Sequence, residues 1–522
     1  MSKSLGLAKV SARGGFNVLW GLTFSSIISA VGIMVVAGIL PEEEFGLVSI
    51  VLIGPNIITT IRDLGLDRAT IKYTTQYKTE NNITKLKSII VSGTLAELVL
   101  GTVFTVISLF LSGVMANILE RPAIVPLIQI ASFTILADAL LKAAQSAFIG
   151  YEKMNYHSLT LVFHSIFKTG LMILLVMLNF GAYGAIVGNA ISYLSAGIVG
   201  AVLLYMVLLK RLQNEEGKLE IVSTLKTMLK FGLPLSIAMM LAGVLGQFYS
   251  FLVAIYTTDL IVGNYQVALS FAMLVSIFAT SVTTVLFPTF SKLKAKEDSE
   301  TLRRVFQYSV KYAALLIVPA TFAVMALSKP GVETIFRDKY EFTPLFLSLY
   351  IGTFLYSAIG NLSAGNLINS QGKTQFNLKV TALTFVIGLI VSLVLIPQFG
   401  ILGLLVTHLT IGMPGILVSL WWINKNYNAT IDWKSSVKIL IASAISAVVT
   451  YLITSQIILA SWIILIIGAA VFLATYILTA PLIGAINYND TQNLKEMLKS
   501  LGPLAPLITP LLLPIEKITK NK

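Results

Sequence analysis

Fourteen apolar segments follow one another along the 522-residue chain. A helix needs roughly 20 apolar residues to cross the hydrocarbon core of a bilayer. Only 12% of the residues are charged, whereas soluble domains carry roughly 25%. The sequence therefore predicts an all-α polytopic membrane protein and argues against soluble classes. The segments lie at roughly 16–40, 45–61, 88–112, 123–149, 157–179, 181–209, 229–256, 262–290, 308–328, 343–368, 376–397, 399–424, 437–458 and 461–486.

The basic residues are divided unequally between alternate loops. Of the 37 Lys and Arg residues, 31 fall on the side that holds both termini, four fall on the opposite side, and two lie inside segments. Cytoplasmic loops of membrane proteins carry the excess of Lys and Arg. We therefore expect a multi-pass protein of the cytoplasmic (plasma) membrane with both termini in the cytoplasm. The formal charge of +13 is explained by this topology, so no nucleic-acid partner is predicted.

The chain contains an internal repeat. The motif NFGAYG at 179–184 resembles QFGILG at 398–403, and Lys153 matches Lys373, with offsets of 219 and 220. Six segments separate the copies, so both have the same orientation, as in transporters built from parallel repeats. The predicted division is an N-lobe, an inter-lobe linker, a C-lobe, two additional helices and a cytoplasmic or interfacial tail, at 1–212, 213–228, 229–424, 437–486 and 487–522.

Few ionisable side chains lie inside the segments, and each is costly in a bilayer without a partner or a hydrated cavity. Asp138 and Lys142 share one helical face, as do His164 and Lys168 in the next segment. Counting from the intervening loop puts Asp138 and Lys168 at equal depth. One hypothesis is a buried Asp138–Lys168 salt bridge; the other is a cationic cavity lined by Lys142, His164 and Lys168. Glu97 and Asp138 are the candidates for ion coupling.

Signatures of enzymes are missing from the sequence. There is no H-E-x-x-H, P-loop or G-x-S-x-G motif, and no D-x-D pair that would hold a metal against a nucleotide sugar. Cysteine is absent, which excludes thiolate metal sites and cysteine nucleophiles. We therefore predict a protein that is not an enzyme and that uses neither cofactor nor metal.

Several short motifs in order resemble one transporter family. LPEEEFGLVS at 40–49, DLGLDRA at 63–69, FGLPL at 231–235 and Phe287-Pro288 are similar to stretches of the polysaccharide (Wzx-type) flippases of the multidrug/oligosaccharidyl-lipid/polysaccharide exporter superfamily. The resemblance covers the first twelve segments. It implies two six-helix lobes that form a V around a central cavity. It also implies that an isoprenoid-pyrophosphate-linked glycan is moved between leaflets by alternating access, coupled to H+, Na+ or the membrane potential.

The resemblance assigns partners and leaves alternatives open. The implied partners are the lipid-linked glycan and membrane lipid, and Lys142, His164 and Lys168 would compensate the pyrophosphate charge. This chain has Gln247 where relatives often place a charge, so Gln247, Asn361 and Asn366 are candidates for glycan contacts. The alternatives are a cation-coupled multidrug or small-molecule exporter of the same superfamily and a membrane glycosyltransferase or polymerase. The glycan, the isoprenoid carrier, the coupling ion and the oligomeric state stay open.

Overall fold

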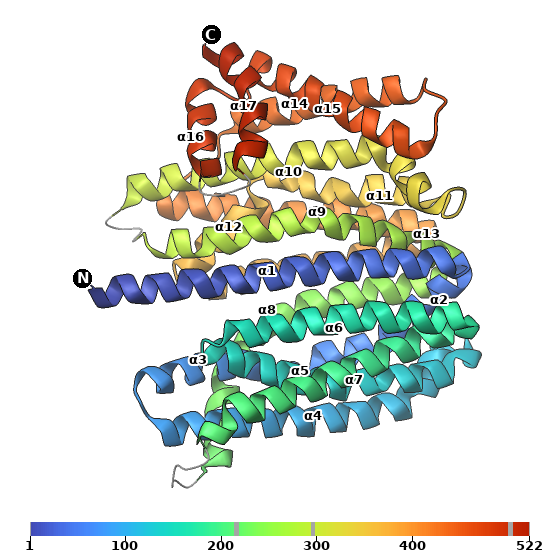
Figure 1. Cartoon of the computed structure of the whole chain (residues 1–522), viewed down its shortest axis with the longest axis vertical. Coiled ribbons are helices and arrows are strands. Elements are labelled where there is room, and N and C mark those ends of the chain that lie inside the picture. The colour runs from blue at the N-terminus through green and yellow to red at the C-terminus, as the bar shows by residue number, and fades with distance from the viewer. Residues whose placement is uncertain (1, 213–218, 294–297, 500–504, 521–522) are drawn as a thin grey trace. The chain divides into compact units, whose positions relative to one another are not determined.

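The computed structural model describes residues 2–212, 219–293, 298–499 and 505–520, and no strand occurs among them (Figure 1). The all-α prediction is confirmed. The chain forms two compact units, of which unit 1 comprises residues 1–270 and 385–404. Its elements are α1 (Ser2–Ile39), α2 (Glu42–Arg62), α3 (Leu66–Thr79), α4 (Ile83–Ile118), η1 (Pro122–Ile124), α5 (Val125–Gly150), α6 (Met154–Leu175), η2 (Val176–Phe180), α7 (Gly181–Val207), η3 (Leu209–Leu212), α8 (Ile221–Tyr256) and the first part of α9 (Asp259–Ser291).

Unit 2 comprises residues 271–384 and 405–522, so the long helix α13 contributes to both units. Residues 213–218 of the predicted linker lie outside the described residues, and the lobes at 1–212 and 229–424 stay a prediction. The elements that follow α9 are α10 (Ser299–Phe336), α11 (Thr343–Ile351), η4 (Gly352–Ile359), α12 (Asn361–Ser370), α13 (Thr374–Tyr427), α14 (Trp433–Thr454), α15 (Ser461–Ile483), α16 (Tyr488–Lys499) and α17 (Ala505–Lys520).

Local sequence signals explain where several helices begin. Three glutamates, residues 42–44, occupy the first turn of α2, where the helix dipole favours negative charge. The side chains of Asn82 and Asp432 accept hydrogen bonds from the backbone N–H groups of Lys85 and Ser435, which caps α4 and α14. These caps fix the boundaries between loops and membrane helices.

The described residues hold 11 helices that are long and apolar enough to cross a membrane, or up to 12 when the bent pair α11–η4 and α12 counts as one span. Two of these stretches, Met154–Leu212 and Thr374–Tyr427, are 59 and 54 residues long. Each is long enough for two spans, because roughly 20 residues suffice. The predicted count of fourteen is compatible with this arrangement.

The two long stretches break at positions that the repeat predicts. Gly181 has φ 54° and ψ −142°, and Gly400, 219 residues later, has φ 55° and ψ −128°. Residues with a Cβ rarely adopt this conformation, so both breaks require glycine. The two copies of the motif therefore share a backbone geometry as well as a sequence pattern.

A second landmark fixes the register of the repeat. The N–H of Lys153 donates to the carbonyl of Phe148, and the N–H of Lys373 donates to that of Ile368, so both bonds are related by an offset of 220. The first copy thus has one more residue between this turn and the break. The π-helix η2 accommodates it, because a π turn contains more residues than an α turn. Equivalent positions are therefore 220 apart before η2 and 219 apart after it.

Two of the motifs that carry the family resemblance contact each other in unit 1. A Cβ on Gly65, which has φ 77°, would lie 2.3 Å from the carbonyl oxygen of Gly232. The reciprocal Cβ on Gly232 would lie 2.3 Å from the carbonyl oxygen of Gly65. Only glycine permits this approach of the segment after α2 to α8. The contact holds the chain in place immediately after Arg62 and Asp63.

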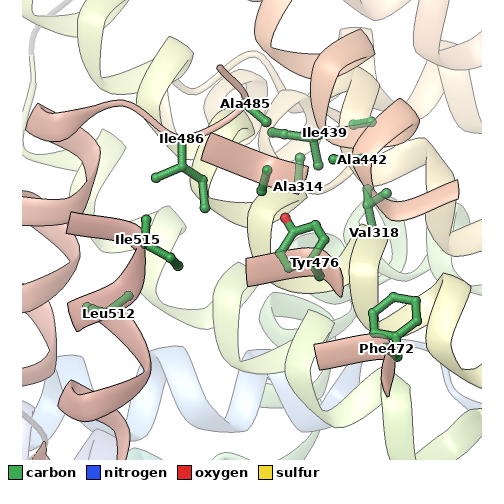
Figure 2. Close-up of a cluster of buried hydrophobic side chains, with 12 residues drawn as sticks. Ala314, Val318, Ile439, Ala442, Phe472, Tyr476, Ala485, Ile486, Leu512 and Ile515 are labelled. Carbon is green, nitrogen blue, oxygen red and sulfur yellow. The ribbon is translucent and has the colours of Figure 1, made fainter. Parts of the chain in front are cut away.

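The core of unit 2 includes a buried cluster from α10, α14, α15, the loop after α15 and α17. Figure 2 shows Phe472 and Tyr476 of α15 in this cluster, together with Leu512 and Ile515 of α17. Ion pairs also hold the tail, since Lys311 of α10 contacts Asp490 at 2.6 Å and Lys495 contacts Glu516 at 2.5 Å. At 16 residues α17 is short for a span, and its first-turn Pro506 is compatible with a helix start.

Candidate functional site

A buried arginine lies at the end of α2. The Arg62 side chain is 1% exposed, and its Nη1 and Nη2 donate to Glu97 of α4 at 2.5 Å and to Asp138 of α5 at 2.7 Å. Its Nε–H is also buried and has no hydrogen-bond partner among the described residues. A buried charge needs partners such as these two carboxylates, since removing the charge from water costs several kcal/mol. Arg62 therefore joins three helices of unit 1.

Lys142 extends this group toward water. Its Nζ lies 3.5 Å from Asp138 and 3.9 Å from Asp63, and its side chain is 35% exposed. We call Arg62, Asp63, Glu97, Asp138 and Lys142 the charge cluster. It has two cations and three carboxylates, so the predicted surplus of positive charge is not present within it. Just outside the cluster, the pKa of the Asp67 carboxyl in α3 is raised, mainly because the group is buried and also because the negative charge of Asp63 is near.

The predicted Asp138–Lys168 salt bridge is not formed. Asp138 pairs with Arg62 and Lys142, and none of the described residues forms an ion pair with Lys168. The reason is packing: α6 lies mainly against α1 and α7 and touches α5 much less. Equal depth in consecutive helices therefore did not bring the two side chains together.

His164, on α6, forms none of the ion pairs of the charge cluster. Its ring packs on the ring of Tyr193 in α7, with 4.2 Å between centroids, and its Nε2 is buried without a partner among the described residues. His164 and Lys168 stay candidate residues of a cationic surface on α6.

The neutral candidates lie elsewhere. Gln247 is half-buried on α8. The Asn366 amide donates to the carbonyl of Leu362 within α12, so it satisfies its own helix. Asn361, the first residue of α12, lines a cavity of about 280 Å³ in unit 2. Asn361 is therefore a candidate that lies at a cavity.

Sequence reasoning missed Arg62 because it directly follows the second apolar segment and was counted as a loop cation. One signal was available. Glu97 and Asp138 are two carboxylates inside membrane segments, and Lys142 alone cannot neutralise both. Arg62 directly follows another apolar segment and could have been considered as the second cation. Asp63 belongs to the motif at 63–69 and was not predicted as a site residue.

The sequence of this chain matches known families. A family model described as "Polysaccharide biosynthesis protein" matches residues 35–343. The chain belongs to this family. The resemblance to polysaccharide flippases noted above is thus confirmed at the level of the family. A second model, described as "Lipid II flippase MurJ", matches residues 264–478.

Individual relatives of this polysaccharide biosynthesis family protein are distant. It is 23% identical over 404 residues to the membrane protein MJ1068 of Methanocaldococcus jannaschii, and the matched region covers 74% of this chain and 78% of MJ1068. It is 22% identical over 370 residues to the lipopolysaccharide biosynthesis protein WzxC of Escherichia coli, covering 69% and 70%. The solved structure of the lipid II flippase MurJ in an inward closed conformation has a TM-score of 0.71 at 17% identity, covering 89% of this chain and 98% of that one. The fold is therefore shared with MurJ.

Proposed function

We propose that this protein is a flippase, not an enzyme, that moves an oligosaccharide linked to isoprenoid pyrophosphate across the cytoplasmic membrane by alternating access. Membership of a polysaccharide biosynthesis family and similarity to WzxC support this proposal. The lobes at 1–212 and 229–424 are the proposed moving parts, and both termini are placed in the cytoplasm because of the loop charges.

The observation that carries the proposal is that one cation of the charge cluster is bound more tightly than the other. Arg62 is buried and bonded at 2.5 and 2.7 Å, whereas Lys142 is partly exposed and its carboxylates lie at 3.5 and 3.9 Å. Arg62 fixes the helices, and the Lys142 ammonium is free to exchange its weak contacts for a stronger one. A pyrophosphate offers several anionic oxygens for charge-assisted hydrogen bonds.

Ion coupling follows from the same exchange. When Lys142 turns to a pyrophosphate, Asp63 loses a counter-charge and Asp138 keeps only Arg62. Uptake of H+ or Na+ by a carboxylate of the cluster, Asp138 or Glu97, would restore neutrality in a site where unpaired charge is costly. His164 and Lys168, on α6, are proposed as the next cationic surface for the headgroup.

A second candidate is a cation-coupled exporter of small molecules. The observation that favours it is the excess of three carboxylates over two cations in the cluster, which suits a positively charged substrate. Such an exporter would expel cationic dyes, and Asp63 or Asp138 would be its binding groups.

The test is Lys142→Gln in purified protein reconstituted into vesicles. The substrates are fluorescent oligosaccharides on undecaprenyl and dolichyl pyrophosphate, and transfer is read with a membrane-impermeant quencher. We expect Lys142→Gln to fold normally and to lose at least tenfold in transfer rate, and Lys142→Arg to keep part of the rate because the charge remains. Lys329→Gln is the matched control, because Lys329 also has a carboxylate one turn away, Glu333 at 3.8 Å, but is 77% exposed.

Unchanged transfer by Lys142→Gln would remove the proposed role of this residue. Efflux of a cationic dye by the wild type, without glycolipid transfer on either carrier, would establish the exporter instead.

A further inference from the structure

The second copy of the repeat differs from the first at a pair of ring positions. In the first copy His164 and Tyr193 pack ring on ring, 4.2 Å apart. With offsets of 220 before η2 and 219 after it, their equivalents are Thr384 and Gly412. Both rings are thus replaced by small residues. Thr384 and Gly412 line the 280 Å³ cavity of unit 2 that also contacts Asn361.

The walls of this cavity combine aromatic rings with neutral polar groups. The rings are those of Tyr350, Phe354 and Tyr356. The hydroxyl, amide and imidazole groups come from Thr353, Ser357, Asn361, Thr384 and His408. None of the described lining residues carries a carboxylate, an ammonium or a guanidinium group. The lining therefore suits neither a metal ion nor a phosphate.

One polar group of the lining lacks a partner. Ser357 is 2% exposed, and its Oγ has no hydrogen-bond partner among the described residues. A buried hydroxyl without a partner costs about 1–3 kcal/mol. The Ser357 hydroxyl thus keeps an unused hydrogen-bonding capacity in the wall of the cavity.

The helix that lines one side of the cavity is irregular. Ser357 lies in η4, a 3₁₀ stretch of 8 residues, and Gly360 with φ 86° ends it. The helix bends by 53° at this point. Long 3₁₀ stretches are uncommon, and broken membrane helices line the substrate sites of many transporters. The Tyr356 hydroxyl donates to the carbonyl of Leu409 in α13, which holds the two walls together.

We propose that this cavity binds one uncharged sugar ring of the transported glycan, an assignment that rests on the proposed function for the identity of the natural ligand. A sugar ring has apolar C–H faces that pack on aromatic rings and hydroxyls that pair with amide, hydroxyl and imidazole groups. The volume is near the lower end for ligand pockets, so it fits one small ring rather than a chain. Charged sugars are disfavoured, because the lining offers no counter-charge.

The experiment measures sugar binding by the purified full-length protein, without transport. The probes are methyl glycosides of glucose, galactose and N-acetylglucosamine, with methyl glucuronide as the charged comparison, followed by saturation-transfer NMR. Gly412→Phe fills the cavity, since even a Cβ at Gly412 would lie 3.2 Å from the Tyr356 ring. Gly331→Phe is the matched control, because a Cβ there meets nothing within 4 Å.

We expect saturable signals from at least one neutral glycoside, at least tenfold weaker binding of the glucuronide, and at least tenfold weaker binding of the neutral probe by Gly412→Phe but not by Gly331→Phe. If Gly412→Phe does not fold, Asn361→Leu decides, because it removes the amide from the cavity lining and keeps a similar volume. No neutral binding by the wild type, or equal binding by the filled and control variants, would overturn the proposal. Failure of glycolipid transfer in vesicles with sugar binding intact would instead refute only the flippase.

Discussion

The charge cluster of unit 1 and the neutral cavity of unit 2 occupy related places in the two repeats. Lys142 of the cluster corresponds to Leu362 of the cavity lining at the offset of 220. In the first copy, charged side chains cross-link α2, α4 and α5. In the second, the helix is broken, and Thr384 and Gly412 stand where the first copy has the rings of His164 and Tyr193, so that a cavity without charged lining residues is present. The two copies of the repeat thus differ in character, since one carries a cluster of charged side chains and the other an uncharged cavity.

The largest effect expected from this difference is at Arg62. Arg62→Leu leaves Glu97 without its close counter-charge and Asp138 with only the loosely held Lys142, and breaking a buried ion pair in this way costs about 3–5 kcal/mol. We expect a large loss of monodisperse protein in detergent and a strongly lowered melting temperature. The double variant Arg62→Leu/Glu97→Leu should recover part of this loss, because it removes one unpaired charge.

The control is Arg304→Gln, which breaks a pair with Glu300 in which the side chains are 67% and 75% exposed. Exposed pairs contribute little, so its melting temperature should stay near that of the wild type. An Arg62→Leu protein as stable as this control would show that the cluster does not hold the helices together.

The second effect tests whether the cavity really lacks counter-charge. Leu362→Lys puts the cation of the first copy into the lining of the second. We expect destabilisation of about 2.5–3.5 kcal/mol, since no described carboxylate lines the cavity to compensate it. Leu362→Met, which keeps the position apolar, is the control. Thermal unfolding of both variants over a range of pH gives the comparison, and a Leu362→Lys protein of unchanged stability would contradict the neutral character of the cavity.

The smallest effect concerns the backbone that the repeats share. Gly181→Ala and Gly400→Ala each force a Cβ into a conformation that costs about 1–3 kcal/mol. Gly181→Ala should be the worse of the two. A Cβ there would lie 2.6 Å from the Glu44 carboxylate, which accepts a hydrogen bond from the Ala182 N–H at the start of α7. Equal melting temperatures for the two variants would show that this cap adds nothing.

Much of the fold was predictable from local features of the sequence. The apolar segments predicted the helices, because a backbone in lipid must satisfy its own hydrogen bonds. The motif around Gly181 and Gly400 predicted two equivalent breaks, since glycine alone tolerates that conformation. Candidate residues such as Asp138 and Lys142 were found because charge inside a span is rare and costly.

The partners of those residues were decided by the tertiary structure. Depth along a helix can be counted from the sequence, but the direction in which a side chain points, and which helix it meets, depend on packing between helices that are distant in the chain. Asp138 therefore pairs with Arg62, which is 76 residues away, and not with Lys168 of the next helix. The cavity of unit 2 likewise arises from contacts among η4, α12 and α13. The sequence by itself determined which residues must be helical and which charges needed a partner, and only the packing of the helices chose that partner.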